Sequence, residues 1–246
     1  RGSRQGKALA IVGIALSTLF LVVGMALIGF VGYKIMRISQ EGTASIEGII
    51  AKEGRYHEAK MLYLADHLAK AHPEGRYLLI TNQQTEFNED RYRVMMNALK
   101  PLNIAQTHEV MPPEEMGAEM MPEADLFLTA EMFDKIIERY SDCDMVISTL
   151  GLPMDYRDME FWKTDPKKRP KLVLVDAYVY DLKVAIKVSA IAAVVQYRPD
   201  AEYKPDETVP SDINEAFAKR YILITPENVD EMDKSYPGLF MEEEKK

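Results

Sequence analysis

The pattern of hydrophobic and polar positions divides the chain into an apolar N-terminal run and a longer amphipathic part. The 26 residues from Ala8 to Tyr33 contain no charged side chain. A helix rises about 1.5 Å per residue and needs about 20 apolar residues to cross a bilayer. The run is also longer than the apolar core of a cleaved signal peptide, which has about 7–15 residues. We therefore predict a single transmembrane anchor at Ala8–Tyr33.

Basic residues flank this predicted anchor on both sides, at Arg1, Arg4 and Lys7 before it and at Lys34 and Arg37 after it. The compact arm before the span has no acidic residue, which favours an N-terminus inside the cell. We therefore expect a single-pass membrane protein whose remaining chain lies on the extracytoplasmic, periplasmic side.

A helical pattern follows the anchor. Between residues 45 and 72, apolar side chains recur every three or four positions, as in an amphipathic helix. Gly48 and Gly54 weaken its first half, so a break is expected near Gly54. The predicted domains are the anchor with its basic arm at 1–37, a linker with this helix at 38–72, and an α/β domain at 73–246.

Strands and helices alternate in the rest of the chain. Short apolar runs bounded by turn residues predict buried strands at 77–81, 104–110, 144–149, 171–175, 191–196 and 221–225. Helical spacing predicts helices at 88–100, 129–140, 181–188 and 212–219. Strands buried on both faces and separated by helices are typical of an α/β three-layer sandwich with a mainly parallel sheet.

Folds of this class bind ligands beyond the carboxyl ends of their strands. Asn82 and Asp176 directly follow predicted strands, and Gln196 ends another. These three residues are therefore candidate ligand contacts.

Composition narrows the classes of partner. The chain has 39 acidic and 30 basic residues, which give a formal net charge of −9. None of its first 37 residues is acidic. The part after the anchor is therefore more acidic still. This balance argues against a nucleic-acid partner, because phosphates require a basic face.

The sequence contains no motif of a known catalytic or cofactor site. No glycine-rich phosphate loop is present, and the four histidines lack the spacing of metal ligands. Asp142 and Asp144 flank the only cysteine, Cys143, and would raise its pKa rather than activate it. We therefore predict a protein without catalytic activity, cofactor or metal.

Three segments resemble the sugar-type periplasmic binding proteins. Ile191-Ala-Ala-Val-Val-Gln-Tyr-Arg-Pro199 is similar to the strand of that family that ends in a glutamine, and Tyr221-Ile-Leu-Ile-Thr-Pro-Glu-Asn-Val-Asp-Glu231 to the strand and helix start that follow it. The pair Asp90-Arg91 is similar to the acid–arginine pair that opens a helix in the C-terminal lobe. The resemblance covers roughly residues 56–240 and implies ligand contacts at Arg91 and Gln196.

The chain also departs from the pattern of that family. It has room for about one lobe, whereas a complete binding protein closes two lobes on its ligand. The asparagine–aspartate pair after the third strand of the lobe has no counterpart in Ser148-Thr-Leu-Gly-Leu-Pro153, and Val94 replaces a glycine in the arginine helix. Arg91 has an alternative interpretation as the ion-pair partner of Asp90 or Glu89.

The leading hypothesis is a membrane-anchored, one-lobed domain that recognises a small, sugar-like solute or a protein partner. The alternative is a structural subunit of a membrane-associated assembly, in which another copy or another protein replaces the missing lobe. In that alternative the Met- and Pro-rich loop 111–122 and the pair Phe161-Trp162 supply a contact surface. Phe161 and Trp162 are otherwise expected either to stack on a sugar ring or to pack in the core.

Overall fold

The computed structural model describes residues 48–82, 86–111, 128–203 and 207–240. Its contacts divide the chain into two units, Arg1–Ala51 and Lys52–Lys246, and the second unit contains the fold described below. The predicted anchor Ala8–Tyr33 lies outside the described residues. Within the four described ranges, no helix is both long and apolar enough to cross a membrane.

The centre of the fold is a six-stranded sheet in the order β2-β1-β3-β4-β5-β6. The first five strands are parallel, and β6 is antiparallel to β5. This confirms the predicted α/β fold with a mainly parallel sheet. The strands are β1 (Arg76–Thr81), β2 (Asn103–Glu109), β3 (Met145–Ser148), β4 (Lys171–Val175), β5 (Ile191–Tyr197) and β6 (Tyr221–Ile224).

The reversed direction of β6 follows from the point at which the chain re-enters the sheet. The N–H of Arg198, just after β5, donates to the carbonyl oxygen of Arg220, just before β6, at 2.9 Å. Tyr197 is paired with Tyr221 in the ladder. The segment between the two strands therefore returns to the edge that it left, and β6 runs back along β5.

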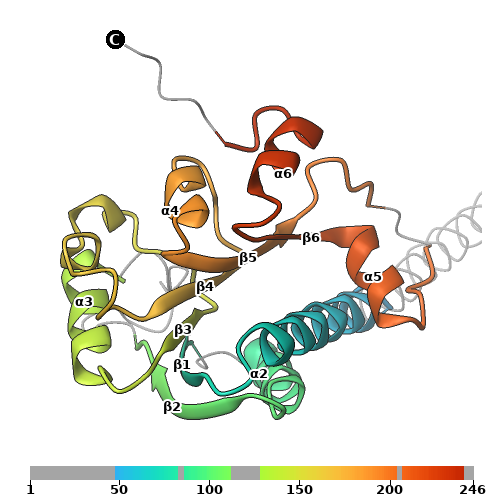
Figure 1. Cartoon of the computed structure of the whole chain (residues 1–246). Helices are drawn as coiled ribbons and strands as arrows, with labels where there is room; N and C mark the ends of the chain where they lie inside the picture. The colour runs from blue at the N-terminus through green and yellow to red at the C-terminus, as the bar shows by residue number, and fades with distance from the viewer. Residues whose placement is uncertain (1–47, 83–85, 112–127, 204–206, 241–246) are drawn as a thin grey trace, which may run out of the picture. The chain divides into compact units, whose positions relative to one another are not determined.

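Helices cover both faces of the sheet (Figure 1). Successive side chains of a strand point to opposite faces. In β1, Leu78 and Ile80 join a core beneath the helices of one face, and Tyr77 and Leu79 join a second core beneath the helices of the other. The first core packs against α3 (Ala130–Arg139), α4 (Lys183–Lys187) and α6 (Val229–Ser235). The second packs against the helix over residues 48–71, α2 (Glu86–Ala98) and α5 (Ile213–Arg220).

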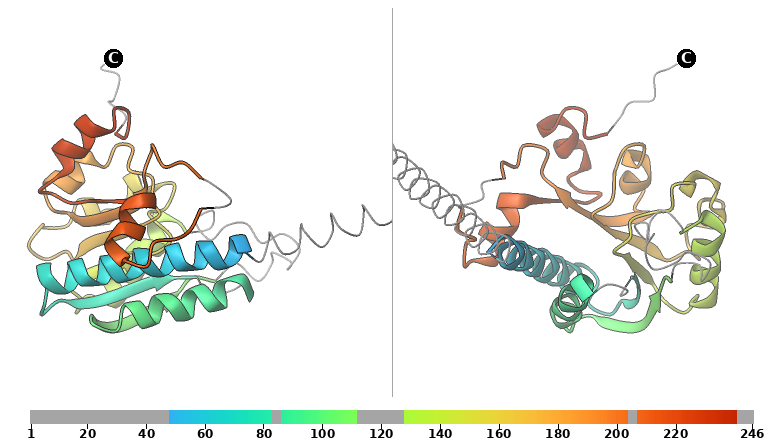
Figure 2. Two further views of the ribbon diagram at one scale, coloured as in Figure 1. Left: turned by 90° about the vertical axis from the view of Figure 1, so that its right-hand side faces the viewer. Right: turned by 180° about the vertical axis from the view of Figure 1, so that it is seen from behind.

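Helix 48–71 lies beside α2 on its face of the sheet (Figure 2). The predicted break near Gly54 is wrong, because the helix continues through that residue. A Cβ atom added to Gly54 would meet nothing within 4 Å. Tyr56, Met61 and Leu64 are fully buried beneath the helix. Packing of this apolar face outweighs the weak helix propensity of glycine.

The segment after β3 packs on the face of the sheet that carries α3. It contains two short 3₁₀ helices, η2 (Tyr156–Asp158) and η3 (Glu160–Trp162). Phe161 is only 3% exposed and belongs to the core, and Trp162 packs partly buried against it. Of the two interpretations of this aromatic pair, core packing is the one that the structure supports. The predicted contact loop at 111–122 lies, from residue 112 on, outside the described residues.

Candidate functional site

The carboxyl ends of the parallel strands meet at one edge of the sheet, as the fold class requires. Asn82 follows β1, Asp176 follows β4, and Gln196 lies near the end of β5. Helix 48–71 runs toward the start of β1, so its first turns lie at this same edge. The polar residues gathered here form the candidate site.

The centre of the site is an ion pair between Lys60 and Asp176, which are 116 positions apart in the chain. The side chain of Lys60 is 2% exposed and that of Asp176 is 40% exposed. The ammonium group is therefore buried, whereas the carboxylate reaches the surface. Asp176 also has a left-handed backbone conformation with φ of 57°, and its N–H donates to the carbonyl oxygen of Val195 at 2.8 Å.

One tyrosine ring lies beside the buried ammonium group, and a second tyrosine packs against the first. The Nζ atom of Lys60 lies 5.1 Å from the ring centroid of Tyr221, within the range of a cation–π contact. The rings of Tyr221 and Tyr197 are 4.9 Å apart. Burial raises the pKa of both phenols, so both stay neutral and keep their hydroxyl protons for hydrogen bonding.

His57 lies almost one helical turn before Lys60. Its Nε2 atom is buried and has no hydrogen-bond partner among the described residues. Burial, followed by the charge of Lys60, lowers its pKa to about 4, against the opposing charge of Asp176. The ring is therefore neutral near pH 7, with one buried nitrogen available to a ligand or a water molecule.

The structure brings three of the four predicted site residues to one part of this edge. Arg91 is exposed on α2, and its charge lowers the pKa of both His57 and Tyr197. Gln196 is partly buried on β5. It directly follows Val195, whose carbonyl oxygen accepts the hydrogen bond from the Asp176 N–H.

Gln196 and Tyr197 point to opposite faces, because side chains alternate along a strand. Tyr197 points to the face of Lys60, and Gln196 to the face that carries α4 and α6. Asn82 is separated from Asp176 by β3. Any ligand that touches all the predicted residues must therefore lie across the edge rather than on one face of the sheet.

Sequence reasoning missed Lys60, His57 and the two tyrosines. The available signal was the position of Lys60, which stands four residues after Tyr56 and four before Leu64, within the buried stripe of the helix. A lysine at such a position requires a partner, because an unpaired buried charge is costly. Its partner is not local, and no pattern in the sequence identifies it.

Other polar groups at the edge are satisfied within the fold. The Thr149 hydroxyl lies 3.1 Å from that of Thr81, and the Ser148 hydroxyl donates to the carbonyl oxygen of Gly151 at 2.6 Å. These contacts occupy the place at which the sequence lacks the asparagine–aspartate pair of the binding proteins.

A second buried ion pair supports the first turns of helix 48–71. Arg220 pairs with Glu207, and both side chains are 6% exposed. Tyr56 donates its hydroxyl to Glu207 Oε1 at 3.2 Å, and the Arg220 guanidinium lies 4.3 Å from the Tyr56 ring. Burial alone would raise the pKa of Glu207, but hydrogen bonds from Arg220 and Lys219 hold it at about 2.

The side chains at this edge offer both hydrogen-bond donors and hydrogen-bond acceptors. It presents a carboxylate acceptor at Asp176, a phenol at Tyr197, a neutral imidazole at His57 and a guanidinium donor at Arg91. The described residues contain no group of three or more His, Cys, Asp or Glu side chains able to hold a metal ion. At the opposite edge, burial and then Asp142 raise the pKa of the Cys143 thiol, as expected from the sequence.

Comparison with known proteins gives similarities of fold. No family model matches the chain. No curated protein matches it either. Among solved structures, an arabinose-binding protein from Geobacillus stearothermophilus shares 17% identity with a TM-score of 0.41, over 72% of this chain and 63% of its own. The Caulobacter myo-inositol-binding protein shares 14% identity with a TM-score of 0.43, over 71% of this chain and 60% of its own.

A solute-binding protein from Burkholderia graminis, solved with D-arabinose, shares 12% identity with a TM-score of 0.43, over 70% of this chain and 60% of its own. The chain thus spans less than two thirds of the length of these structures. These structures are of sugar- and solute-binding proteins, the class of protein that the motifs resemble, and the likeness is one of fold.

Proposed function

We propose that the part of the chain after the anchor is a recognition domain that binds a small, sugar-like solute at the carboxyl edge of its sheet, without catalysis. The observation that carries the proposal is the pair of buried Lys60 and half-exposed Asp176. One oxygen of the carboxylate is held by the ammonium group, and the other can accept a hydrogen bond from a solute hydroxyl.

The charge of the site supports a neutral polyhydroxylated ligand. Apart from the exposed Arg91 guanidinium, the groups of the site carry no net charge: Lys60 and Asp176 neutralise each other, His57 is neutral near pH 7, and the Tyr197 phenol is neutral. A sugar offers hydroxyls that both donate to Asp176 and accept from Arg91. The aromatic ring of Tyr197, which is 51% exposed, adds an apolar surface beside them.

The test is a thermal-shift screen of the full chain in detergent against a panel of neutral sugars, polyols and amino acids. A ligand that binds only the folded state raises the melting temperature in a saturable manner. We expect at least one sugar or polyol to do so, and we expect Asp176→Asn to abolish the response. A flat panel, or a response that survives Asp176→Asn, contradicts the proposal.

A structural role is the second candidate, and exposed apolar side chains at the same edge favour it. Tyr178 is 80% exposed and stacks on Tyr180, with ring centroids 5.9 Å apart, and Met154 is 78% exposed. Large exposed aromatic and methionine side chains are enriched in protein interfaces. Light scattering that shows a stable oligomer, together with a flat solute panel, would support this second function.

The membrane anchor completes the proposal. A domain held at the membrane by Ala8–Tyr33 suits fixed sensing or assembly better than delivery of a captured solute. Reporter fusions at each terminus test the topology. An active cytoplasmic reporter at the C-terminus would contradict the periplasmic location that we propose.

A further inference from the structure

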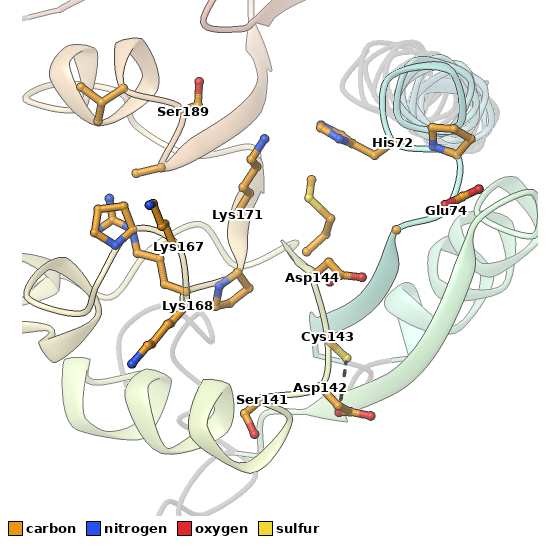
Figure 3. Close-up of a pocket in the computed structure, with 18 residues that line it drawn as sticks. His72, Glu74, Ser141, Asp142, Cys143, Asp144, Lys167, Lys168, Lys171 and Ser189 are labelled. Atoms are coloured by element: carbon orange, nitrogen blue, oxygen red, sulfur yellow. Dashed lines mark hydrogen bonds between the residues drawn. The ribbon is translucent and has the colours of Figure 1, made fainter.

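A pocket of about 760 Å³ lies at the opposite, amino edge of the sheet (Figure 3). It is lined by segments that lead into β1, β3, β4 and β5, and it shares no residue with the carboxyl-edge site. Its volume is within the range of small-molecule sites, about 300–1,000 Å³.

One wall of this pocket is cationic. Lys167, Lys168, Arg169 and Lys171 all come from the segment that leads into β4. In Figure 3, Lys167 and Lys171 extend upward, on the side of Ser189, whereas Lys168 extends the other way. Neither Lys167 nor Lys171 forms an ion pair with a carboxylate of the described residues, although Lys163 and Lys187 do.

Other charged groups line the pocket as well, among them Glu74 and Lys168, and several groups in or beside it are engaged within the fold. Arg76 pairs with Asp142 at 2.7 Å, and its backbone N–H donates to the Asp144 carboxylate at 3.0 Å. The Arg169 guanidinium donates to the carbonyl oxygen of Phe161 at 3.3 Å and lies 5.1 Å from its ring. The ammonium groups of Lys167 and Lys171 therefore form no ion pair with the described residues, although Lys171 interacts electrostatically with Glu227. The net charge of the whole chain is −9.

We propose that this pocket is a second binding site, which holds a small phosphate-bearing anion between Lys167 and Lys171. Lysine carries a compact point charge that suits a phosphate group, whereas a carboxylate is better matched by the fork of an arginine. Ser189, from the segment that leads into β5, also lines the pocket. The remaining volume accommodates a small organic group on the phosphate. The proposal is independent of solute binding at the carboxyl edge.

Calorimetric titration of the full chain in detergent with sodium pyrophosphate, at constant ionic strength, tests this site. We expect one saturable binding event, at least about tenfold weaker in Lys167→Gln/Lys171→Gln, because both counter-charges are lost. Lys100→Gln is the matched control, since Lys100 is exposed beyond the end of α2 and forms no ion pair with the described residues. It should bind pyrophosphate as the original chain does. Succinate should bind much more weakly.

Three results would overturn the proposal: no saturable binding, equal affinity in the double variant, or succinate binding as tightly as pyrophosphate. If the double variant does not fold, each single variant takes its place. A second readout is His72, which also lines the pocket and whose pKa is lowered by burial and then by the charge of Lys171. Bound pyrophosphate should raise that pKa in an NMR titration, and an unchanged value would contradict binding here. None of these results depends on the sugar panel.

Discussion

The Lys60 ammonium and the Asp176 carboxylate join the middle of helix 48–71 to the end of β4 across 116 positions of the chain. The contact does two things at once. It neutralises a lysine that is 2% exposed, and it fixes the direction of a carboxylate that is 40% exposed. Lys60 therefore stabilises the fold and also orients the Asp176 carboxylate, the group that we expect to bind a solute.

Asp176→Asn should lower the free energy of unfolding by about 1–3 kcal/mol, because it leaves the buried ammonium group without its counter-charge. Asparagine tolerates the left-handed backbone of this position, so the loss reports on the charge and not on the main chain. Lys60→Met should cost less, because an apolar side chain of similar length can fill the same space. Urea denaturation of both variants measures the difference. A smaller loss in Asp176→Asn than in Lys60→Met would contradict this account of the pair.

The buried ring of His57 predicts a pH dependence of stability. Its pKa is lowered from 6.5 to about 4 in the folded protein. Between these values the unfolded chain binds a proton that the folded chain does not, so stability falls as the pH falls from 6.5 toward 4. The contribution is at most about 3 kcal/mol. Urea denaturation at several pH values should show a smaller loss over this window in His57→Gln. An identical pH profile in both proteins would show that burial of His57 is not its cause.

The pair of Arg220 and Glu207 gives a second test of buried charge. Arg220→Met removes the main partner of a carboxylate that is 6% exposed, and should destabilise the fold by about 2–4 kcal/mol. Adding Glu207→Gln should recover part of this loss, since it removes the unpaired charge. Thermal or urea unfolding of the single and double variants tests this coupling. If the double variant loses the sum of the free energies of unfolding that the two single variants lose, the ion pair does not stabilise the fold as described.

Most of the strands were predictable because they are short apolar runs that end at a turn; β2, Asn103–Glu109, is the more polar exception. β4 was predicted at 171–175 and spans Lys171–Val175, and the direction of the first five strands follows from the alternation with helices. The direction of β6 was not predictable. It depends on Arg198 meeting Arg220 at the sheet edge, and no local pattern specifies where a connection returns.

The candidate site was predictable only in part, because local sequence patterns do not specify contacts between distant segments of the chain. Position after a strand was sufficient to identify Asp176, because the carboxyl ends of parallel strands meet at one edge. The ion pair that orients it comes from Lys60, on a helix that the periodicity predicts but does not place. Helical spacing shows which side chains share a face, whereas the partner across the sheet is set by tertiary packing.

Two glycines should respond in opposite ways to alanine. Gly54 lies within a continuous helix, and an added Cβ would meet nothing within 4 Å, so Gly54→Ala should stabilise the protein by about 0.5–1 kcal/mol. Gly151 has φ of 68°, and an added Cβ would lie 3.3 Å from the Cβ of Ala177. Gly151→Ala should therefore destabilise the fold by about 1–2 kcal/mol. Differential scanning calorimetry measures both changes. A destabilising Gly54→Ala would mean that the first turns of the helix are not continuous.

Solute binding at the carboxyl edge should depend on Arg91 and not on Arg93, which lies two positions along α2 and about 200° around the helix. For a sugar that raises the melting temperature, Arg91→Ala should weaken binding about tenfold, because two directed hydrogen bonds from the guanidinium group are lost. Gln196→Ala should have a comparable effect. Arg93→Ala is the matched control.

Since the Arg91 side chain is exposed, its removal should leave the melting temperature of the free protein nearly unchanged. The loss of affinity would then be separable from any loss of stability. Titration calorimetry of the variants with the same sugar gives the dissociation constants. If Arg91→Ala and Gln196→Ala both bind as tightly as Arg93→Ala, the solute does not lie across this edge. The proposed site would then include only the residues on the face of the sheet that carries Lys60, His57 and Tyr197.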